Sequence, residues 1–141
     1  MKIAVSACLL GTNCKYDGRN NLNTSLASLL AGHEIVPVCP EGAGGLPCPR
    51  VPAEIADGKV VTRDGRDVTD AFDTGAKRCF EKVKDCDLAI LKSRSPSCGS
   101  SAIYDGSFTG QLTAGEGIFA RMLKEAHIPI LEADAFCHED Y

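Results

Sequence analysis

Residues 88–99 read LAILKSRSPSCG, an apolar run that passes into a loop of small polar residues around Cys98. A short apolar run bounded by turn residues is typical of a buried strand. The same order, an apolar run followed by a cysteine, occurs at residues 2–8 and 34–39. In an open parallel sheet, ligands bind beyond the carboxyl ends of the strands. We therefore expect three thiols to meet at one edge of a sheet: Cys8, Cys39 and Cys98.

Helical patterns alternate with these strands. Apolar residues recur at helical spacing over residues 23–30, 68–84 and 115–126, and a further short strand is expected at residues 128–131. Strands that alternate with helices are typical of α/β proteins. The sequence predicts an α/β fold, a three-layer sandwich with a mainly parallel, Rossmann-like sheet, formed by residues 1–141 as a single domain.

Three connecting segments carry strong turn signals. Residues 39–52 contain four prolines and three glycines, a composition that excludes regular structure and favours an ordered functional loop. Residues 53–67 contain Asp-Gly twice around a β-branched run, which predicts a small hairpin. Residues 99–113 are expected to form a polar loop.

Composition excludes several classes of partner. The chain has 141 residues, a formal net charge of −4 and no block of basic residues, so we expect no nucleic-acid or membrane surface. Residues 1–10 are explained better by a strand than by a signal peptide, and no apolar stretch is long enough to cross a bilayer. We therefore expect a cytoplasmic protein, either a monomer or a homodimer.

The eight cysteines favour metal or thiol chemistry over disulfides, because no export signal is expected. Three thiolates from separate loops can bind zinc or an iron–sulfur cluster, and they leave one metal position without a protein ligand. One alternative is a non-catalytic domain that binds zinc or senses iron–sulfur status. A thiol oxidoreductase is disfavoured because Cys-x-x-Cys is absent. Each cysteine alone could also be a small buried hydrophobe.

The remaining cysteines fall into different classes. Cys14 and Cys48 lie in the two loops expected at the site, so either could be a fourth ligand or a nearby thiol. The patterns place Cys79 on the apolar face of a helix and Cys86 before a strand, where we expect packing roles. Cys137 with His138 is a weak metal-binding candidate near the terminus.

Polar residues beside the three cysteines could take part in a reaction. Glu41 follows Cys39 by two residues and could act as a general acid or base, or could cap backbone amides. Ser97 precedes Cys98 and could bind substrate, or could be a turn residue. Arg19 and Arg50 could each hold an anionic or carbonyl-bearing ligand, or lie on the surface.

Three motifs resemble those of the bacterial thiouracil desulfurase family, and the resemblance extends over essentially the whole chain. They are SACLLG at residues 6–11 with YDG at 16–18, CPE at 39–41 with GGLP at 44–47 and PR at 49–50, and LK at 91–92 with SPSCG at 95–99.

The resemblance implies an oxygen-sensitive [4Fe-4S] cluster held by Cys8, Cys39 and Cys98, and a reaction in which Glu41 and Ser97 take part. Membership would not fix the substrate; our leading hypothesis is the redox-neutral desulfuration of a thiolated nucleobase such as 2-thiouracil, in which water activated by Glu41 attacks the carbon. The family position that matches Cys14 is not always cysteine, so Cys14 is not expected to be an obligatory ligand.

Overall fold

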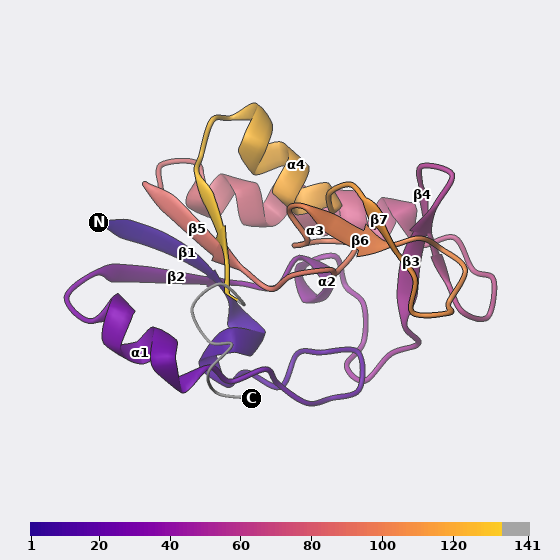
Figure 1. The fold of residues 1–141 in the computed structure, drawn as a ribbon, viewed down its shortest axis with the longest axis horizontal. Helices are drawn as coiled ribbons and strands as arrows, with labels where there is room; N and C mark the ends of the chain where they lie inside the picture. The colour runs from indigo at the N-terminus through magenta and orange to yellow at the C-terminus, as the bar shows by residue number, and fades with distance from the viewer. Residues whose placement is uncertain (134–141) are drawn as a thin grey trace.

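A four-stranded parallel sheet forms the centre of the molecule (Figure 1). The structure is a computed structural model, and it describes residues 1–133. The strands are β1 (Lys2–Ser6), β2 (Glu34–Val38), β5 (Leu88–Leu91) and β8 (Ile130–Glu132). They are arranged in the order β2-β1-β5-β8, and every neighbouring pair is parallel. The expected parallel sheet is confirmed, and its first three strands are those that precede the three cysteines.

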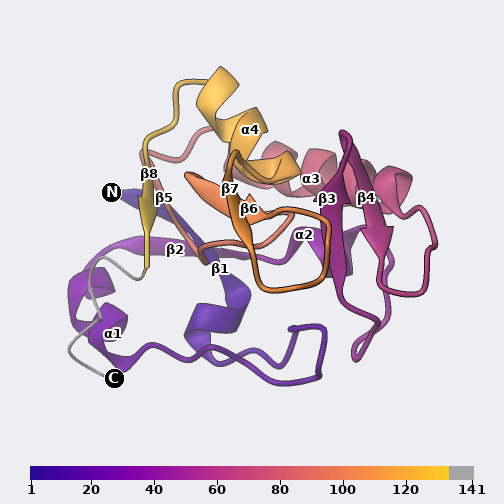
Figure 2. The same ribbon diagram turned by 45° about the vertical axis from the view of Figure 1, so that its right-hand side comes forward.

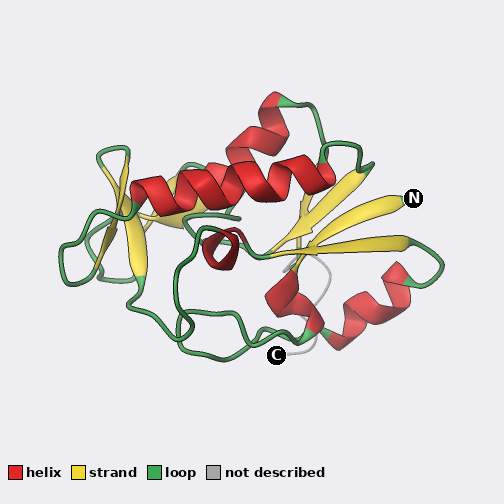
Figure 3. Cartoon of the chain, turned by 180° about the vertical axis from the view of Figure 1, so that it is seen from behind, coloured by secondary structure: helices red, strands yellow, loops and turns green. Residues whose placement is uncertain are grey.

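Helices cover both faces of this sheet. Alternate residues of β1 point to opposite sides, so Ile3 and Val5 pack against one layer while Ala4 packs against the other. The first layer consists of the 3₁₀ helix η1 (Ala7–Leu10) and α1 (Thr24–Leu30), and the second of α3 (Thr69–Val83) and α4 (Ile118–Glu125). Figure 3 shows the sheet between these two layers. The three-layer α/β sandwich is thus confirmed.

Helices α1 and α3 begin and pack where the sequence pattern indicates, whereas α4 begins at Ile118, three residues later than expected. Asn23 caps α1, because its side-chain oxygen accepts a hydrogen bond from the Leu26 amide at 3.3 Å. In α3, Phe72 and Cys79 lie on the buried face, and Cys79 is only 2% exposed. Cys86 is also buried in this core. The packing roles expected for Cys79 and Cys86 are therefore confirmed.

Two segments differ from the sequence prediction. Pro40–Ala43 form a short helix, α2, inside the stretch expected to be irregular, and proline is favoured in the first turn of a helix. The expected polar loop contains a second hairpin of β6 (Ala102–Tyr104) and β7 (Leu112–Ala114). The hairpin of β3 (Ala53–Ala56) and β4 (Lys59–Thr62) was expected and is confirmed.

The two hairpins lie side by side beyond the sheet (Figure 2). The Glu54 carboxylate joins them, because its Oε1 accepts hydrogen bonds from the amides of Gly106 at 3.0 Å and Phe108 at 3.2 Å. The guanidinium of Arg63 lies 5.6 Å from the centre of the Phe108 ring, within the range of a cation–π contact. The hairpins therefore form one wall against the ends of the strands.

Within residues 1–133, no helix is both long enough and apolar enough to span a membrane. Cys137 and His138, the weak metal-binding candidates, lie outside the described residues.

Candidate active site

One cavity of about 530 Å³ opens at the carboxyl ends of β1, β2 and β5. This volume is within the range of roughly 300–1,000 Å³ that is typical of small-ligand sites. The position follows from the topology, because β1 has β2 on one side and β5 on the other, and a crevice forms where the strand order reverses. Four cysteines line the cavity: Cys8, Cys14, Cys39 and Cys98.

Each of the three strand-end cysteines is held by its own local structure. Cys8 lies in η1 directly after β1, and the Asn21 side-chain amide donates a hydrogen bond to its sulfur at 3.6 Å. Cys39 is the N-cap residue of α2. The amide of Cys98 donates to Ser95 Oγ at 2.7 Å, which fixes the turn that follows β5. The structure thus brings Cys8, Cys39 and Cys98 together from three separate segments.

Burial keeps two of these thiols protonated in the absence of a cation. Desolvation raises the pKa of Cys8. It raises the pKa of Cys98 to about 12, although hydroxyls of Ser6 and Ser97 oppose the shift. A cationic group bound in the cavity would compensate for the lost hydration and would displace the protons from the sulfurs. Thiol donors with little access to water therefore suit a metal centre, and Cys98, which is only 5% exposed, is such a donor.

The cysteine donors can be compared with the needs of different metal centres. Among residues 1–133, no three His, Cys, Asp or Glu side chains lie close enough together to hold one metal ion. The ligands of an iron–sulfur cluster bind different irons, so their sulfurs need only surround a common volume. The cavity provides such a volume between the cysteines. Cysteines from separate segments around one cavity are the donor set that an iron–sulfur cluster uses, so the residues present fit such a cluster.

Glu41 and Ser97 lie in contact within this cavity. The hydroxyl of Ser97 donates to Glu41 Oε2 at 3.1 Å, and it lies 3.3 Å from the hydroxyl of Ser95. The other carboxylate oxygen, Oε1, accepts a hydrogen bond from Arg50 Nε at 3.1 Å, and Arg50 Nη2 lies 3.1 Å from it as an ion pair. Both carboxylate oxygens are thus engaged, one by an arginine and one by a hydroxyl that can exchange partners with a bound ligand.

The arginines are placed differently from one another. Arg50 lines the cavity with a side chain that is only 8% exposed, so it is not a surface residue. Arg19 is exposed and does not line the cavity. The ion pair between Arg50 and Glu41 was missed by the sequence analysis, because it joins two residues of a segment without periodic structure.

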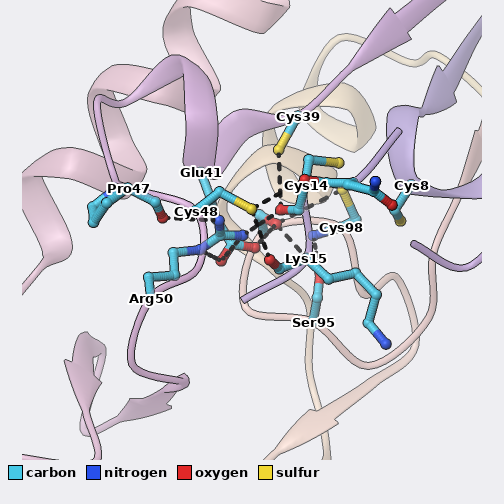
Figure 4. A network of polar contacts seen from close by, with 12 residues as sticks. Cys8, Cys14, Lys15, Cys39, Glu41, Pro47, Cys48, Arg50, Ser95 and Cys98 are labelled. Carbon is cyan, nitrogen blue, oxygen red and sulfur yellow. Dashed lines mark hydrogen bonds and ion pairs between the residues drawn. The ribbon is translucent and has the colours of Figure 1, made fainter. Parts of the chain in front are cut away.

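Cys14 and Cys48, the two loop cysteines considered as further ligands, differ in their position relative to the cavity. Cys14 lines the cavity, and its carbonyl oxygen lies 4.0 Å from the Cys39 sulfur. Burial and the neighbouring Cys39 raise the pKa of the Cys14 thiol. Cys48 is exposed, does not line the cavity, and donates to the carbonyls of Asn13 and Lys15 at 3.1 Å each. Figure 4 shows Arg50 together with five cysteines: Cys8, Cys14, Cys39, Cys48 and Cys98.

The outer wall of the cavity was not anticipated from the sequence. Arg63, Arg94, Tyr104 and Phe108 line it; Tyr104 and Phe108 belong to the hairpin of β6 and β7, and Arg63 directly follows β4. Arg94 adopts a left-handed backbone conformation with φ of 71° in the turn after β5. Such a conformation is uncommon for a non-glycine residue and is often found at functional sites. The sequence signal that could have predicted this hairpin is the turn dipeptide Asp105-Gly106 between the aromatic residues Tyr104 and Phe108.

Comparison with known proteins identifies the family. The sequence profile of 2-thiouracil desulfurase matches residues 3–135. The chain belongs to the 2-thiouracil desulfurase family. A solved structure of the [4Fe-4S]-dependent thiouracil desulfidase TudS is 42% identical, with a TM-score of 0.88, and the match covers 97% of this chain and 93% of that one. Bacillus subtilis (strain 168) YbbK, an uncharacterized protein, is 39% identical over 136 residues, which cover 88% of this chain and 90% of YbbK. The resemblance inferred from the three motifs is confirmed.

Proposed function

We propose that this protein is a [4Fe-4S]-dependent desulfurase that hydrolyses the carbon–sulfur bond of a thiolated nucleobase such as 2-thiouracil. In the overall reaction, C=S and water give C=O and hydrogen sulfide. The carbon keeps its oxidation state, so no external electrons are needed. Membership of the 2-thiouracil desulfurase family supports this proposal, and so does the likeness to TudS. The observation that carries it is the contact between Glu41 and Ser97 inside a cavity lined by cysteines.

Cys8, Cys39 and Cys98 are the residues that we assign to the cluster. They follow three neighbouring strands and line the same cavity. When bound by three cysteines, such a cluster supplies one iron with an open position that acts as a Lewis acid. Zinc would leave the same protein colourless, whereas a bound cluster gives it broad visible absorbance, so colour after anaerobic purification separates the two alternatives.

Glu41 and Ser97 are assigned to the proton transfers. A carboxylate that is paired with an arginine can accept a proton from an attacking water and return it to the departing sulfur. Glu41 has one oxygen, Oε2, turned toward Ser97, and this is the oxygen that we assign to the water. The hydroxyl of Ser97 can then donate a hydrogen bond to the substrate or to the departing sulfur.

The reaction can be tested with protein reconstituted with iron and sulfide under anaerobic conditions. We expect uracil and sulfide to be released from 2-thiouracil in equal amounts. Glu41→Gln should keep the visible absorbance of the cluster but lose at least about 100-fold in kcat, the lower end of the usual contribution of a general base. Glu116→Gln is the matched control, because Glu116 pairs with Lys124 outside the cavity. A loaded cluster without turnover of any thiolated base would contradict the proposal.

The same measurements separate the enzyme from a non-catalytic metal-binding or iron–sulfur-sensing domain. In such a domain, Glu41→Gln would change neither the cluster nor any turnover. A cytoplasmic location, a state of monomer or homodimer, and a single domain over residues 1–141 stay predictions of the sequence.

A further inference from the structure

Arg50 is buried and makes several hydrogen bonds to protein atoms, unlike a charged residue on the surface. Its side chain is 8% exposed, and all three of its nitrogens donate hydrogen bonds to protein atoms. Nε donates to Glu41 Oε1, Nη1 donates to the Pro47 carbonyl at 3.3 Å, and Nη2 donates to the Cys14 carbonyl at 2.9 Å while lying 3.1 Å from Glu41 Oε1 as an ion pair. The backbone amide of Arg50 also donates to the Tyr16 carbonyl at 2.6 Å.

These contacts restrict the Glu41 carboxylate to one orientation. The guanidinium occupies Oε1, so Oε2 is the oxygen that remains turned toward Ser97. Glu41 belongs to a helix of only four residues, and its side chain is 18% exposed. A carboxylate with so little access to water is strongly destabilised when its partner is removed. Without Arg50 the carboxylate would therefore rotate toward solvent and away from Ser97.

The same guanidinium connects Glu41 to the loop that carries Cys14. Its Nη2 forms an ion pair with Glu41 Oε1 and donates a hydrogen bond to the Cys14 carbonyl, and that carbonyl also accepts from the Cys39 sulfur at 4.0 Å. Figure 4 shows Arg50 reaching from its own segment to Glu41 and to the Cys14 loop. A planar fork with several donors can make these contacts simultaneously, whereas a lysine ammonium is a point charge.

We infer that Arg50 is a positioning residue for the desulfuration proposed above, and that it acts through Glu41 rather than on the substrate. It fixes the carboxylate so that Oε2 faces Ser97 and the cysteine cavity. This inference rests on the proposed desulfurase function, and the contact between Arg50 and Glu41 is given by the structure.

The first test compares Arg50→Lys and Arg50→Ala with the wild type after anaerobic cluster reconstitution. We expect kcat to fall about 10- to 100-fold, because a displacement of roughly 1 Å in a reacting group has a cost of this size. KM for 2-thiouracil should stay within about threefold, since no Arg50 nitrogen is assigned to the substrate. Guanidinium ion in the assay should restore part of the activity of Arg50→Ala and none of that of Glu41→Gln.

A double-mutant cycle tests whether Arg50 acts through Glu41. In the Glu41→Gln background, Arg50→Lys should change single-turnover rates less than about twofold, because coupled residues are non-additive. The urea midpoint of unfolding should show the same coupling in protein without a cluster, where no turnover is needed. Arg78→Ala is the matched control, since Arg78 donates to the Ala43 carbonyl of α2 but does not line the cavity.

Four results would overturn the inference: an unchanged kcat in both Arg50 variants, a rise in KM with kcat unchanged, the absence of guanidinium rescue, or additive effects in the cycle. Wild-type protein with a loaded cluster and no turnover would instead remove the proposed function. Additive unfolding midpoints would remove the inference alone, so the two failures are distinguishable.

Discussion

Gly75 of α3 lies directly against the peptide carbonyl of Pro40 in α2. A β-carbon at Gly75 would lie 2.7 Å from the Gly44 amide nitrogen and 2.8 Å from the Pro40 carbonyl carbon. Real side chains do not tolerate such distances, so the close contact between these helices requires glycine. Since α2 begins at Pro40, directly after Cys39, and carries Glu41, this contact fixes the position of two residues proposed for the site.

Gly75→Ala should therefore destabilise the protein and reduce turnover. Overpacking typically costs about 1–3 kcal/mol, and alanine recovers roughly 1 kcal/mol of helix propensity over glycine. We expect a net loss of stability, together with a displacement of α2 that lowers kcat. Urea unfolding of the Gly75→Ala and Thr74→Ala variants tests this, because Thr74 is the exposed neighbour in the same helix. Gly75→Ala protein as stable as the wild type would show that the helices can separate freely.

Cys98 and Cys79 are both buried thiols, at 5% and 2% exposure, but only Cys98 lines the cavity. Cys98→Ala should abolish the binding of iron and sulfide because a cluster ligand is lost. Cys79→Ala should cost roughly 1 kcal/mol of stability, as is usual for a single substitution, and should leave cluster binding intact. Iron and acid-labile sulfide per chain, determined after anaerobic reconstitution, provide the measurement. Equal iron in both variants would remove Cys98 from the ligand set.

The central sheet could be predicted because its strands have a strong physical signature. Strands covered on both faces read as short continuous apolar runs, and β5 (LAIL) is of this kind. The hairpin of β6 and β7 has no such signature, since its strands contain three residues each and β7 is exposed throughout. The helix α2 contains four residues, which is too short to display a helical period.

The meeting of three cysteines at one edge of the sheet could be predicted from the strands that precede them. The contacts around these cysteines could not be predicted. A rule about strand ends places Cys8, Cys39 and Cys98 at one edge of the sheet. Cys14 and Cys48 both belong to loops near that edge, yet only Cys14 faces the cavity. The direction of each side chain depends on the path of an irregular loop, and no periodicity in the sequence records that path.

The ion pair between Lys2 and Asp85 predicts part of the pH dependence of stability. Lys2 Nζ donates to both Asp85 oxygens, at 2.9 and 2.8 Å. The hydrogen bond from Lys2 lowers the pKa of Asp85, and the bond to Asp85 raises the pKa of Lys2. The contribution of Asp85 is therefore complete above its unfolded pKa of about 3.9 and is lost as pH falls through the lower folded value. Lys2 contributes fully below its unfolded pKa of about 10.4, and that contribution is lost as pH rises through the higher folded value.

Urea midpoints of the wild type and Asp85→Asn should accordingly differ at neutral pH and converge as the pH is lowered below about 4, where the native carboxylate becomes protonated. High salt should reduce the difference at neutral pH, because both groups are exposed to solvent and salt screens such pairs. A difference that stayed constant over the whole acid range would show that Asp85 contributes through packing rather than through its charge.

The Cys14→Ser variant tests whether three or four protein thiolates bind the proposed cluster. Cys14 lines the cavity beside Cys39, and its backbone carbonyl accepts a hydrogen bond from Arg50 Nη2 at 2.9 Å. Serine preserves that carbonyl and replaces only the thiol. Since three strand-end cysteines suffice for a cluster with an open iron, we expect Cys14→Ser to retain iron, sulfide and visible absorbance, whereas Cys39→Ser should lose all three. If Cys14→Ser lost iron as completely as Cys39→Ser, four protein thiolates would complete the cluster. No position would then remain for the sulfur of a substrate, and the site would be that of a structural or sensing centre.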